Sequence, residues 1–350
     1  MKTRHRLVLV AGMACLALAS AGLSGVATAA TAVQPYHLVK KVTLGGSGGW
    51  DYFAVEPGTH RLFIARDTHM MIVGPDGHMI KDVSGMNGAH AIAFAPKLGR
   101  AFTSNGRAHS VTVFDLKTLL QARDIPIPGR DPDGILYEPA SNRVFTFNGR
   151  ADDATAIDAS TATVVGRVEL PGRPETAQAD GTGKIYVNIA DKSELSELDA
   201  KTLRVLHTWP MAPCEDPAGL AIDVAHHRLF AGCRNGLMAV IDYTTGKVVA
   251  HFPIGQGNDA ARFDPGTQLA FASCGDGTIT VAHEDSPDKY TVVQTIHTQR
   301  GARTMALDRV SHQIYTVTSK LGPAPPPTAQ RPHPYPTLVP NTFTLFIYSQ

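Results

Sequence analysis

Short runs in which apolar and polar residues alternate recur along the chain from about residue 36 to its end. Two of these runs, at 50–57 and 217–224, are each followed by the tetrapeptide HRLF, which begins at His60 and again at His227. The two copies begin 167 residues apart, which matches about four units of 40–45 residues. Because alternation with a period of two is typical of half-buried β-strands, the pattern predicts a repeated β unit.

The repeat extends over most of the chain. Aligning the alternating runs gives seven units, each continued by a turn and further short apolar stretches, with Gly, Pro, Asn and Asp between them. The first strands of the units begin at Asp51, His90, Asp133, Glu175, Ala218, Asp259 and Arg303, with spacings of 39, 43, 42, 43, 41 and 44 residues. Four short strands per unit, repeated seven times, predict an all-β, seven-bladed β-propeller. A pair of β-sandwiches is the alternative, but it gives no reason for seven units in register.

The last unit contains only three strands before the chain ends. The strand that it lacks is available at the other end of the sequence, at residues 36–44. Pairing that strand with the final one would close the ring and remove its open sheet edges. We therefore predict a single propeller domain over residues 31–350, closed by an N-terminal strand that completes the last blade.

Residues 1–30 have the composition of a secretory signal peptide. Three basic residues among the first six precede an apolar run, and small residues lead to Ala27-Thr28-Ala29. This order predicts cleavage after residue 29 or 30 and a periplasmic or secreted protein. A membrane anchor is the alternative, but small residues thin the apolar run before it reaches the roughly 20 residues of a spanning helix. We expect no transmembrane segment in the mature chain.

The charge of the mature chain argues against one class of partner. The full chain has 32 Lys and Arg against 31 Asp and Glu, and removing the three basic residues of the leader leaves 29 against 31. Because domains that bind nucleic acid are usually basic, we expect no nucleic-acid partner. We expect the protein to be a monomer.

Three cysteines remain after the leader. Cys214 precedes the first strand of the fifth unit, and Cys233 ends the second strand of that unit. Neighbouring antiparallel strands can bring such positions within disulfide reach, so we predict a Cys214–Cys233 disulfide that leaves Cys274 free. The alternatives are three small buried thiols or a site for a soft metal.

Motifs in the second and third strands carry a family resemblance. Residues 186–188 (YVN), 145–148 (FTFN) and 102–105 (FTSN) approximate a Tyr-Val-Thr-Asn motif, and IDYTTGKVV at 241–249 matches the continuation IDxxTGKVV. The chain therefore resembles the YVTN-repeat β-propellers, in particular the exported YncE-like proteins. The resemblance implies the fold over the whole mature chain, but propellers host both enzymes and binding scaffolds, so it leaves the function open. The sixth unit departs from the motif.

Polar residues gather where the predicted first strands begin and the second strands end. Both places lie on one face of a propeller, so the side chains are expected to meet around one mouth of the central channel. The candidate ligand-binding residues are Trp50, Asp51, Arg66, His90, Asn105, Asp133, Asn148, Glu175, Asp216, Asp259 and Arg303. Carboxylates with an imidazole could hold Ca²⁺ or Zn²⁺. The alternative is that the Asp and Asn residues cap recurring turns; no compact metal motif is present, and we assign no metal ligand.

Two histidine-containing segments are expected to be ordinary turns and loops. His226 and His227 are adjacent, and adjacent residues of a strand point to opposite faces, so they would chelate poorly together. Residues 283–285 (HED) follow the third strand of the sixth unit and are expected to form an outer loop.

A proline-rich segment at 322–340 interrupts the last unit. Proline lacks an N–H donor and fixes φ, so this segment is predicted to form an irregular loop. It leaves the end of a second strand, at the polar mouth, and we interpret it as a lid with His333 and Tyr335 as its most interactive side chains. A flexible insertion without such a role is the alternative.

Two functional hypotheses follow. The first is an exported binding or scaffold protein that recognises a small polar ligand, a cation or a protein partner at the mouth. The second, a chemistry that similar propellers carry, is a metal-dependent hydrolase of the lactonase type that uses the carboxylates of the mouth. A subunit of a redox assembly is a third option by fold analogy. No catalytic residue is identified, because the sequence contains no G-x-S-x-G elbow, Walker loop or dinucleotide fingerprint.

Overall fold

The computed structural model describes Met1, residues 33–328, Pro332 and residues 334–350. The chain divides into two units, Met1–Val33 and Gln34–Gln350, and the second contains all the strands. Apart from Met1, the predicted signal peptide lies outside the described residues. Within the described ranges, no helix has the length and hydrophobicity that a membrane crossing requires.

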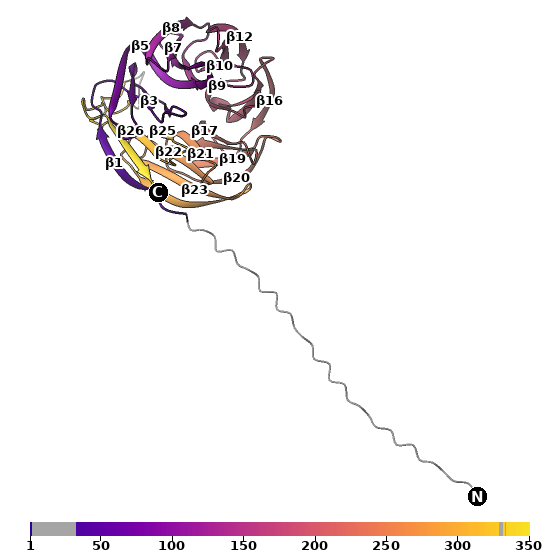
Figure 1. Cartoon of the computed structure of the whole chain (residues 1–350). Helices are drawn as coiled ribbons and strands as arrows, with labels where there is room; N and C mark the ends of the chain where they lie inside the picture. The colour runs from indigo at the N-terminus through magenta and orange to yellow at the C-terminus, as the bar shows by residue number, and fades with distance from the viewer. Residues whose placement is uncertain (2–32, 329–331, 333) are drawn as a thin grey trace. The chain divides into compact units, whose positions relative to one another are not determined.

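The Gln34–Gln350 unit consists of antiparallel sheets arranged like blades (Figure 1). In the described residues the strands form one seven-stranded sheet and five four-stranded sheets. The seven-stranded sheet contains β2 (Phe53–Val55), β3 (Leu62–Ala65), β4 (Asp67–Val73), β5 (Met79–Ala95), β6 (Arg100–Asn105), β7 (Ser110–Asp115) and β8 (Leu120–Pro126). The next two sheets contain β9 (Pro132–Glu138), β10 (Arg143–Asn148), β11 (Asp153–Asp158) and β12 (Thr163–Glu169), then β13 (Pro174–Ala179), β14 (Lys184–Ile189), β15 (Glu194–Asp199) and β16 (Arg204–Pro210).

The remaining three sheets complete the unit. They contain β17 (Pro217–Asp223), β18 (Arg228–Cys233), β19 (Leu237–Asp242) and β20 (Lys247–Pro253), then β21 (Asn258–Asp264), β22 (Leu269–Cys274), β23 (Thr278–Ser286) and β24 (Lys289–His297), and finally β25 (Met305–Leu307), β26 (Ile314–Thr318) and β27 (Thr344–Ser349) with β1 (His37–Thr43). Two short 3₁₀ helices, η1 (Pro96–Leu98) and η2 (Ala190–Lys192), follow strands β5 and β14.

The first two predicted units share one sheet because β5 is continuous. Its first part pairs with β4, from Met79 to Ser84, and its last part pairs with β6, from Ile92 to Ala95. Separate four-stranded sheets were expected here. The two units share a sheet because no loop interrupts β5 between the part that pairs with β4 and the part that pairs with β6. Between these parts, Gly85 and Gly88 take positive φ angles of 98° and 78°.

The two ends of the Gln34–Gln350 unit meet in one sheet. Strand β1 pairs antiparallel with β27, with Lys41 opposite Phe346 and Thr43 opposite Thr344. The predicted pairing of the segment at 36–44 with the last strand is therefore confirmed. Contacts also join the first strands of successive sheets, and β25 contacts β2.

The hydrophobic core lies between neighbouring sheets. Strands β18 and β22 are buried at every residue, whereas most residues of the outer strand β12 are exposed. The ring of Phe230 on β18 stacks on Phe263 of β21 with 4.9 Å between centroids, and it meets Tyr290 of β24 edge-on at 5.5 Å. Because both faces of β18 and β22 are covered, their sequences RLFAGC and LAFASC do not alternate between apolar and polar residues.

The HRLF motif marks a turn that recurs in several of the sequence repeats. His60 and His227 have left-handed φ angles of 60° and 58°, and Asn142, Gln268 and His312 at the equivalent positions have 54°, 55° and 58°. Among residues other than glycine, Asn, Asp and His adopt this conformation most readily. The two copies of HRLF are therefore the same turn in two of the sequence repeats.

Glycine allows the first strands of adjacent sheets to approach closely. A Cβ atom on Gly134 would lie 2.8 Å from the carbonyl oxygen of Glu175, and one on Gly219 would lie 2.6 Å from the amide nitrogen of Ala261. Such distances are too short for any larger residue. This close packing brings the polar ends of the first strands together.

Candidate functional site

Side chains from the starts of several first strands surround a cavity of about 500 Å³. The cavity is lined by Asp51, Tyr52, Asp133, Arg173, Glu175, Arg234, Gly257, Asn258, Asp259, Gly275, Arg303 and Tyr335. Five of the predicted ligand-binding residues are among them, namely Asp51, Asp133, Glu175, Asp259 and Arg303. The lining thus combines four carboxylates with three guanidinium groups, which come from distant parts of the sequence.

His90 forms an ion pair at one side of this cavity. Its Nδ1 atom lies 2.6 Å from Oδ2 of Asp51 and 3.7 Å from Oδ1 of Asp133. Burial by itself lowers the pKa of His90, but the hydrogen bond to Asp51 and the charge of Asp133 outweigh it and raise that pKa to about 9. Burial and the charge of Asp51 raise the pKa of Asp133 to about 8. The cluster therefore favours a protonated imidazole and resists two neighbouring carboxylate charges.

We expect the imidazole of His90 to titrate far above its ordinary value of 6.5, near pH 9. A raised pKa in the folded state means that the stabilisation from this group is complete below pH 6.5 and is lost as the pH rises towards 9. NMR titration of the His90 ring would measure the shift, and Asp51→Asn should bring the pKa down. A wild-type pKa at or below 6.5 would contradict this prediction.

Arg303 joins two carboxylates of the cavity, including that of Asp51. Its Nε atom lies 2.6 Å from Oδ2 of Asp259, its Nη2 lies 3.7 Å from Oδ1 of Asp51, and its guanidinium sits 5.5 Å from the ring centroid of Trp50. The hydroxyl of Tyr52 donates to the backbone oxygen of Asp259 at 3.1 Å. Burial opposes the charge of Arg303, but Asp259 and Asp51 outweigh it and raise the pKa of the guanidinium, so the group stays charged.

A second arginine–carboxylate network lies on the rim. Arg173 pairs with Glu175 and, at 3.3 Å, with Asp216. Arg234 lies 3.1 Å from Asp216 and 3.8 Å from Glu175. Burial raises the pKa of Glu175 while the two arginines oppose the rise. Asp216 was predicted as a ligand residue, but it is not among the residues that line the cavity, and it contacts the two arginines instead.

Arg66, Asn105 and Asn148, also predicted as ligand residues, are buried in the sheets and do not line the cavity. Arg66 is fully buried, donates from Nε to the carbonyl of Gly49 at 2.8 Å, and stacks on Phe343. Asn105 and Asn148 are also buried and bind within their own sheets, to Thr112 at 2.8 Å and to Thr155 at 3.0 Å. Their interpretation as ligand residues is corrected, because these side chains, at or just beyond the ends of second strands, point into the packed sheets.

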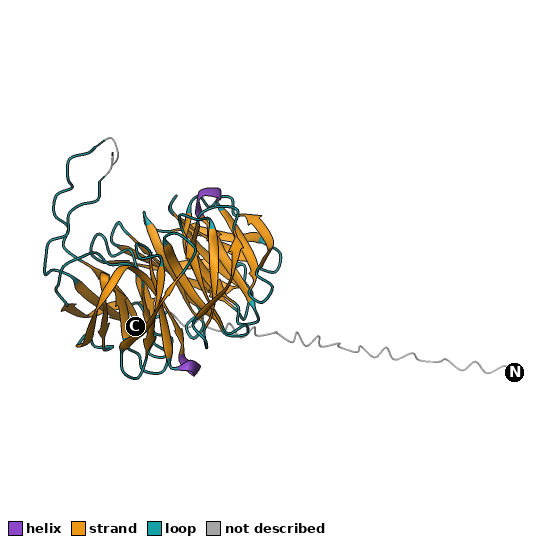
Figure 2. Cartoon of the chain, turned by 90° about the horizontal axis from the view of Figure 1, so that it is seen from above, coloured by secondary structure: helices purple, strands orange, loops and turns teal. Residues whose placement is uncertain are grey.

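The proline-rich loop borders a second cavity of about 480 Å³, beside the first. Trp50, predicted as a ligand residue, lines this second cavity together with Leu321, Leu338 and Tyr335. The arms of the loop pair with each other through Gly322 and Thr337, and in Figure 2 they run away from the sheets. Tyr335 is 92% exposed and lines both cavities. His333 lies outside the described residues, and the lid stays a prediction.

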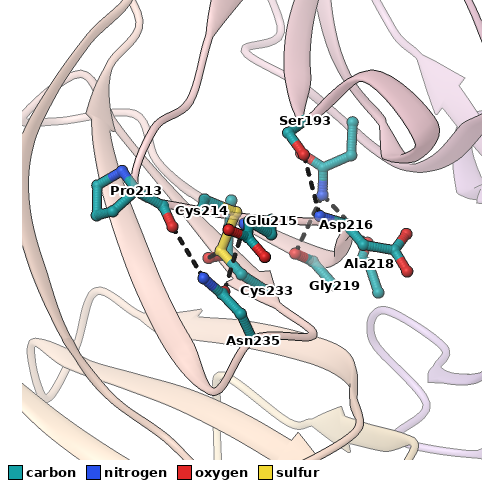
Figure 3. Close-up of a disulfide and its surroundings, with 11 residues drawn as sticks. Ser193, Pro213, Cys214, Glu215, Asp216, Ala218, Gly219, Cys233 and Asn235 are labelled. Atoms are coloured by element: carbon teal, nitrogen blue, oxygen red, sulfur yellow. Dashed lines mark hydrogen bonds between the residues drawn. A yellow bond between two sulfur atoms is a disulfide. The ribbon is translucent and has the colours of Figure 1, made fainter.

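Cys214 and Cys233 form a disulfide at the rim of the site (Figure 3). Their Cα atoms are 5.4 Å apart, and Cys274 is free and buried. Figure 3 also shows Asp216, whose amide donates to Ser193 Oγ at 3.2 Å, close to the disulfide. Because Asp216 and Arg234 adjoin the two cysteines, the disulfide fixes the backbone that carries the arginine–carboxylate network.

Sequence reasoning missed Tyr52, Arg173 and Arg234 at this site. Each lies one or two residues from a position that was recognised: Tyr52 follows Asp51, Arg173 precedes Glu175, and Arg234 follows Cys233. The repeat therefore contained a positional signal, and widening the window around each aligned position would have found them.

Comparison of the chain with known protein families and curated proteins found no match. The interpretation of the site therefore depends on its own geometry.

Proposed function

We propose that this chain is an exported seven-bladed β-propeller, related to the YVTN-repeat proteins, that binds a small polar ligand at the mouth of its central channel. Dividing the seven-stranded sheet within β5 gives seven groups of four strands, which supports the blade count. The pairing of β1 with β27 and the contact of β25 with β2 support a closed ring. The motifs at 186–188 and 241–249 support the family.

Export is supported by two independent features. The leader at residues 1–30 has the charge, apolar run and small residues of a signal peptide. The Cys214–Cys233 disulfide suits an oxidising compartment such as the periplasm or the cell exterior.

One observation carries the binding function: Asp133 Oδ1 is buried at the cavity and has no hydrogen-bond partner among the described residues. An unsatisfied buried acceptor costs about 1–3 kcal/mol, and a ligand with a donor group would remove that cost. The surrounding guanidinium groups of Arg303 and Arg234 supply donors for an acceptor on the same ligand. The site therefore suits a small molecule that offers both donors and acceptors, such as an amino acid or a polyol.

Calorimetric titration with amino acids, polyols and Ca²⁺ tests this proposal. We expect one class of small polar compound to bind, and Asp133→Ala to weaken that binding by about two- to tenfold, the range for an uncharged hydrogen bond, because the raised pKa of Asp133 keeps this carboxyl largely protonated near neutral pH. Asp152→Asn, an exposed change outside the cavity lining, serves as the control. Binding that survives Asp133→Ala unchanged would overturn the proposed site, and a protein partner in place of a small molecule would overturn the ligand class.

A metal-dependent hydrolase of the lactonase type is the second candidate. Asp51, His90 and Asp133 offer three ligand atoms within 4.8 Å of one another, which favours it. However, the 2.6 Å hydrogen bond between His90 and Asp51 already satisfies two of these groups. Metal analysis with a lactone-hydrolysis screen tests the candidate: metal and activity lost together on Asp133→Ala would support it, and a metal-free, inert protein would exclude it.

A further inference from the structure

A second cluster of potential ligands lies away from the mouth, beside the HRLF turn of the fifth unit. Asp223 ends β17, His226 lies in the turn before β18, and Glu284 belongs to β23 of the neighbouring sheet. His226 Nδ1 lies 2.7 Å from Asp223 Oδ2 and 3.3 Å from Glu284 Oε1. One ligand atom from each residue falls within 4.8 Å of the other two. The expectation that residues 283–285 form an outer loop is corrected, because all three residues lie in β23.

The polar atoms of this cluster are buried and unsatisfied. Asp223 is 3% exposed and Glu284 is 2% exposed. Asp223 Oδ2, His226 Nδ1 and Glu284 Oε2 are all buried without a hydrogen-bond partner in the described part of the chain, even though two of them are in close contact. The atoms converge, but they are not aligned as a hydrogen-bonded pair.

The second oxygen of each carboxylate is held in place by the protein. Asp223 Oδ1 accepts from the amide of Ala225 at 3.0 Å, and Glu284 Oε1 accepts from the hydroxyl of Tyr290 at 3.1 Å. Outer contacts of this kind orient metal-binding carboxylates. Arg228, on the following strand, does not neutralise the two carboxylates of the cluster, because its guanidinium pairs with Asp288 at 2.7 Å and Asp242 at 3.5 Å.

Two other histidines of the chain can be compared with His226. His60 and His312 occupy the position of His227 in their own turns, one residue after that of His226, and their Nδ1 atoms form aligned hydrogen bonds with Asp308 at 2.8 Å and Asp264 at 2.7 Å. Those are ordinary His–Asp pairs that join adjacent units. The His226 cluster differs in three ways: His226 contacts the Asp223 carboxylate of its own turn, a second buried carboxylate is present, and the hydrogen-bond alignment is lost.

We propose that Asp223, His226 and Glu284 form a binding site for a divalent transition-metal ion, with Zn²⁺ as the best-matched ion. One imidazole and two carboxylates are a suitable donor set for Zn²⁺, with a fourth position left for water. Ca²⁺ needs six to eight oxygen ligands, more than this cluster supplies. The two carboxylate charges balance the charge of the ion, and His226, whose side chain is 38% exposed, gives access from solvent. Because the ligands come from two sheets, the ion would link adjacent blades.

Titration of the chelator-treated mature chain with Zn²⁺, by calorimetry and metal analysis, tests the proposal. We expect the wild type to bind Zn²⁺ here, with a rise in melting temperature. His226→Ala and the near-isosteric Glu284→Gln should each weaken binding by more than about tenfold, because even outer contacts of a metal site contribute about 10–100-fold. Circular dichroism checks that each variant is folded.

Two matched variants separate this site from the alternatives. His312→Ala breaks an ordinary His–Asp pair and should leave Zn²⁺ binding unchanged. Zn²⁺ binding that is lost on Asp133→Ala but kept in His226→Ala and Glu284→Gln would assign the ion to the mouth and overturn this proposal. A wild-type protein that neither binds Zn²⁺ nor gains thermal stability from it would overturn it as well. Neither result would affect the test of the small polar ligand.

Discussion

Replacing Phe230 with alanine is expected to lower the free energy of unfolding by about 3–5 kcal/mol, the usual cost of deleting a buried aromatic ring. Phe230 is fully buried on β18 and contacts the rings of Phe263 and Tyr290 in the neighbouring sheet. The substitution removes apolar burial and also a contact between two sheets. Because the ring lies between the sheets, we expect the neighbouring side chains to fill little of the space that it leaves. Guanidinium chloride unfolding followed by circular dichroism measures the effect.

Val310→Ala is the control for this experiment. Val310 is 74% exposed, so its truncation should change the free energy of unfolding by no more than about 0.5 kcal/mol. A similar small change for Phe230→Ala would mean that the two sheets do not pack through this ring, and the inter-sheet core described above would be wrong.

Removing the disulfide by the double change Cys214→Ser and Cys233→Ser is expected to cost about 3 kcal/mol. The bond closes a loop with a sequence separation of 19 residues, and without it the unfolded chain gains conformational freedom. Thermal or denaturant unfolding of the oxidised protein and of the double variant gives the difference. We expect the binding of a mouth ligand to weaken too, because Asp216 and Arg234 adjoin the two cysteines.

Thiol counting provides the control for the disulfide. A denatured, oxidised chain of residues 31–350 should contain one reactive thiol, that of Cys274, and three after reduction. Burial raises the pKa of Cys274 to about 12, so this thiol should react slowly in the folded protein. Three reactive thiols before reduction would show that the bond is absent, and the predicted loss of stability would then not occur.

The carboxyl groups of the candidate mouth site differ from turn-capping residues in where their side chains point and in the direction of their pKa shifts. Asp residues at the outer turns, such as Asp115 and Asp199, bind the amides of their own turns, as capping requires. Asp133, Asp259 and Glu175 instead face the cavity, and burial raises the pKa of each. Carboxyl groups whose charged forms are disfavoured in this way are common at functional sites.

Much of the fold follows from the sequence alone. The alternation of apolar and polar residues locates the strands, the regular spacing of the seven first strands aligns the units, and the incomplete last unit predicts that β1 pairs with β27. These features are local or repeated, so a single sequence contains them. The positions of Cys214 and Cys233 likewise indicate the disulfide, because Cys233 ends β18 and Cys214 lies shortly before β17, the strand that pairs with β18.

The direction of individual side chains at the strand ends was decided only by the tertiary structure. Arg66, Asn105 and Asn148 lie where the repeat predicts ligand residues, but packing turns them into the sheets. The cluster of Asp223, His226 and Glu284 spans two sheets, and no sequence motif joins its members. The repeat determines which backbone positions come together, whereas the contacts between sheets determine which side chains meet, since those contacts depend on the shapes of residues far apart in the chain.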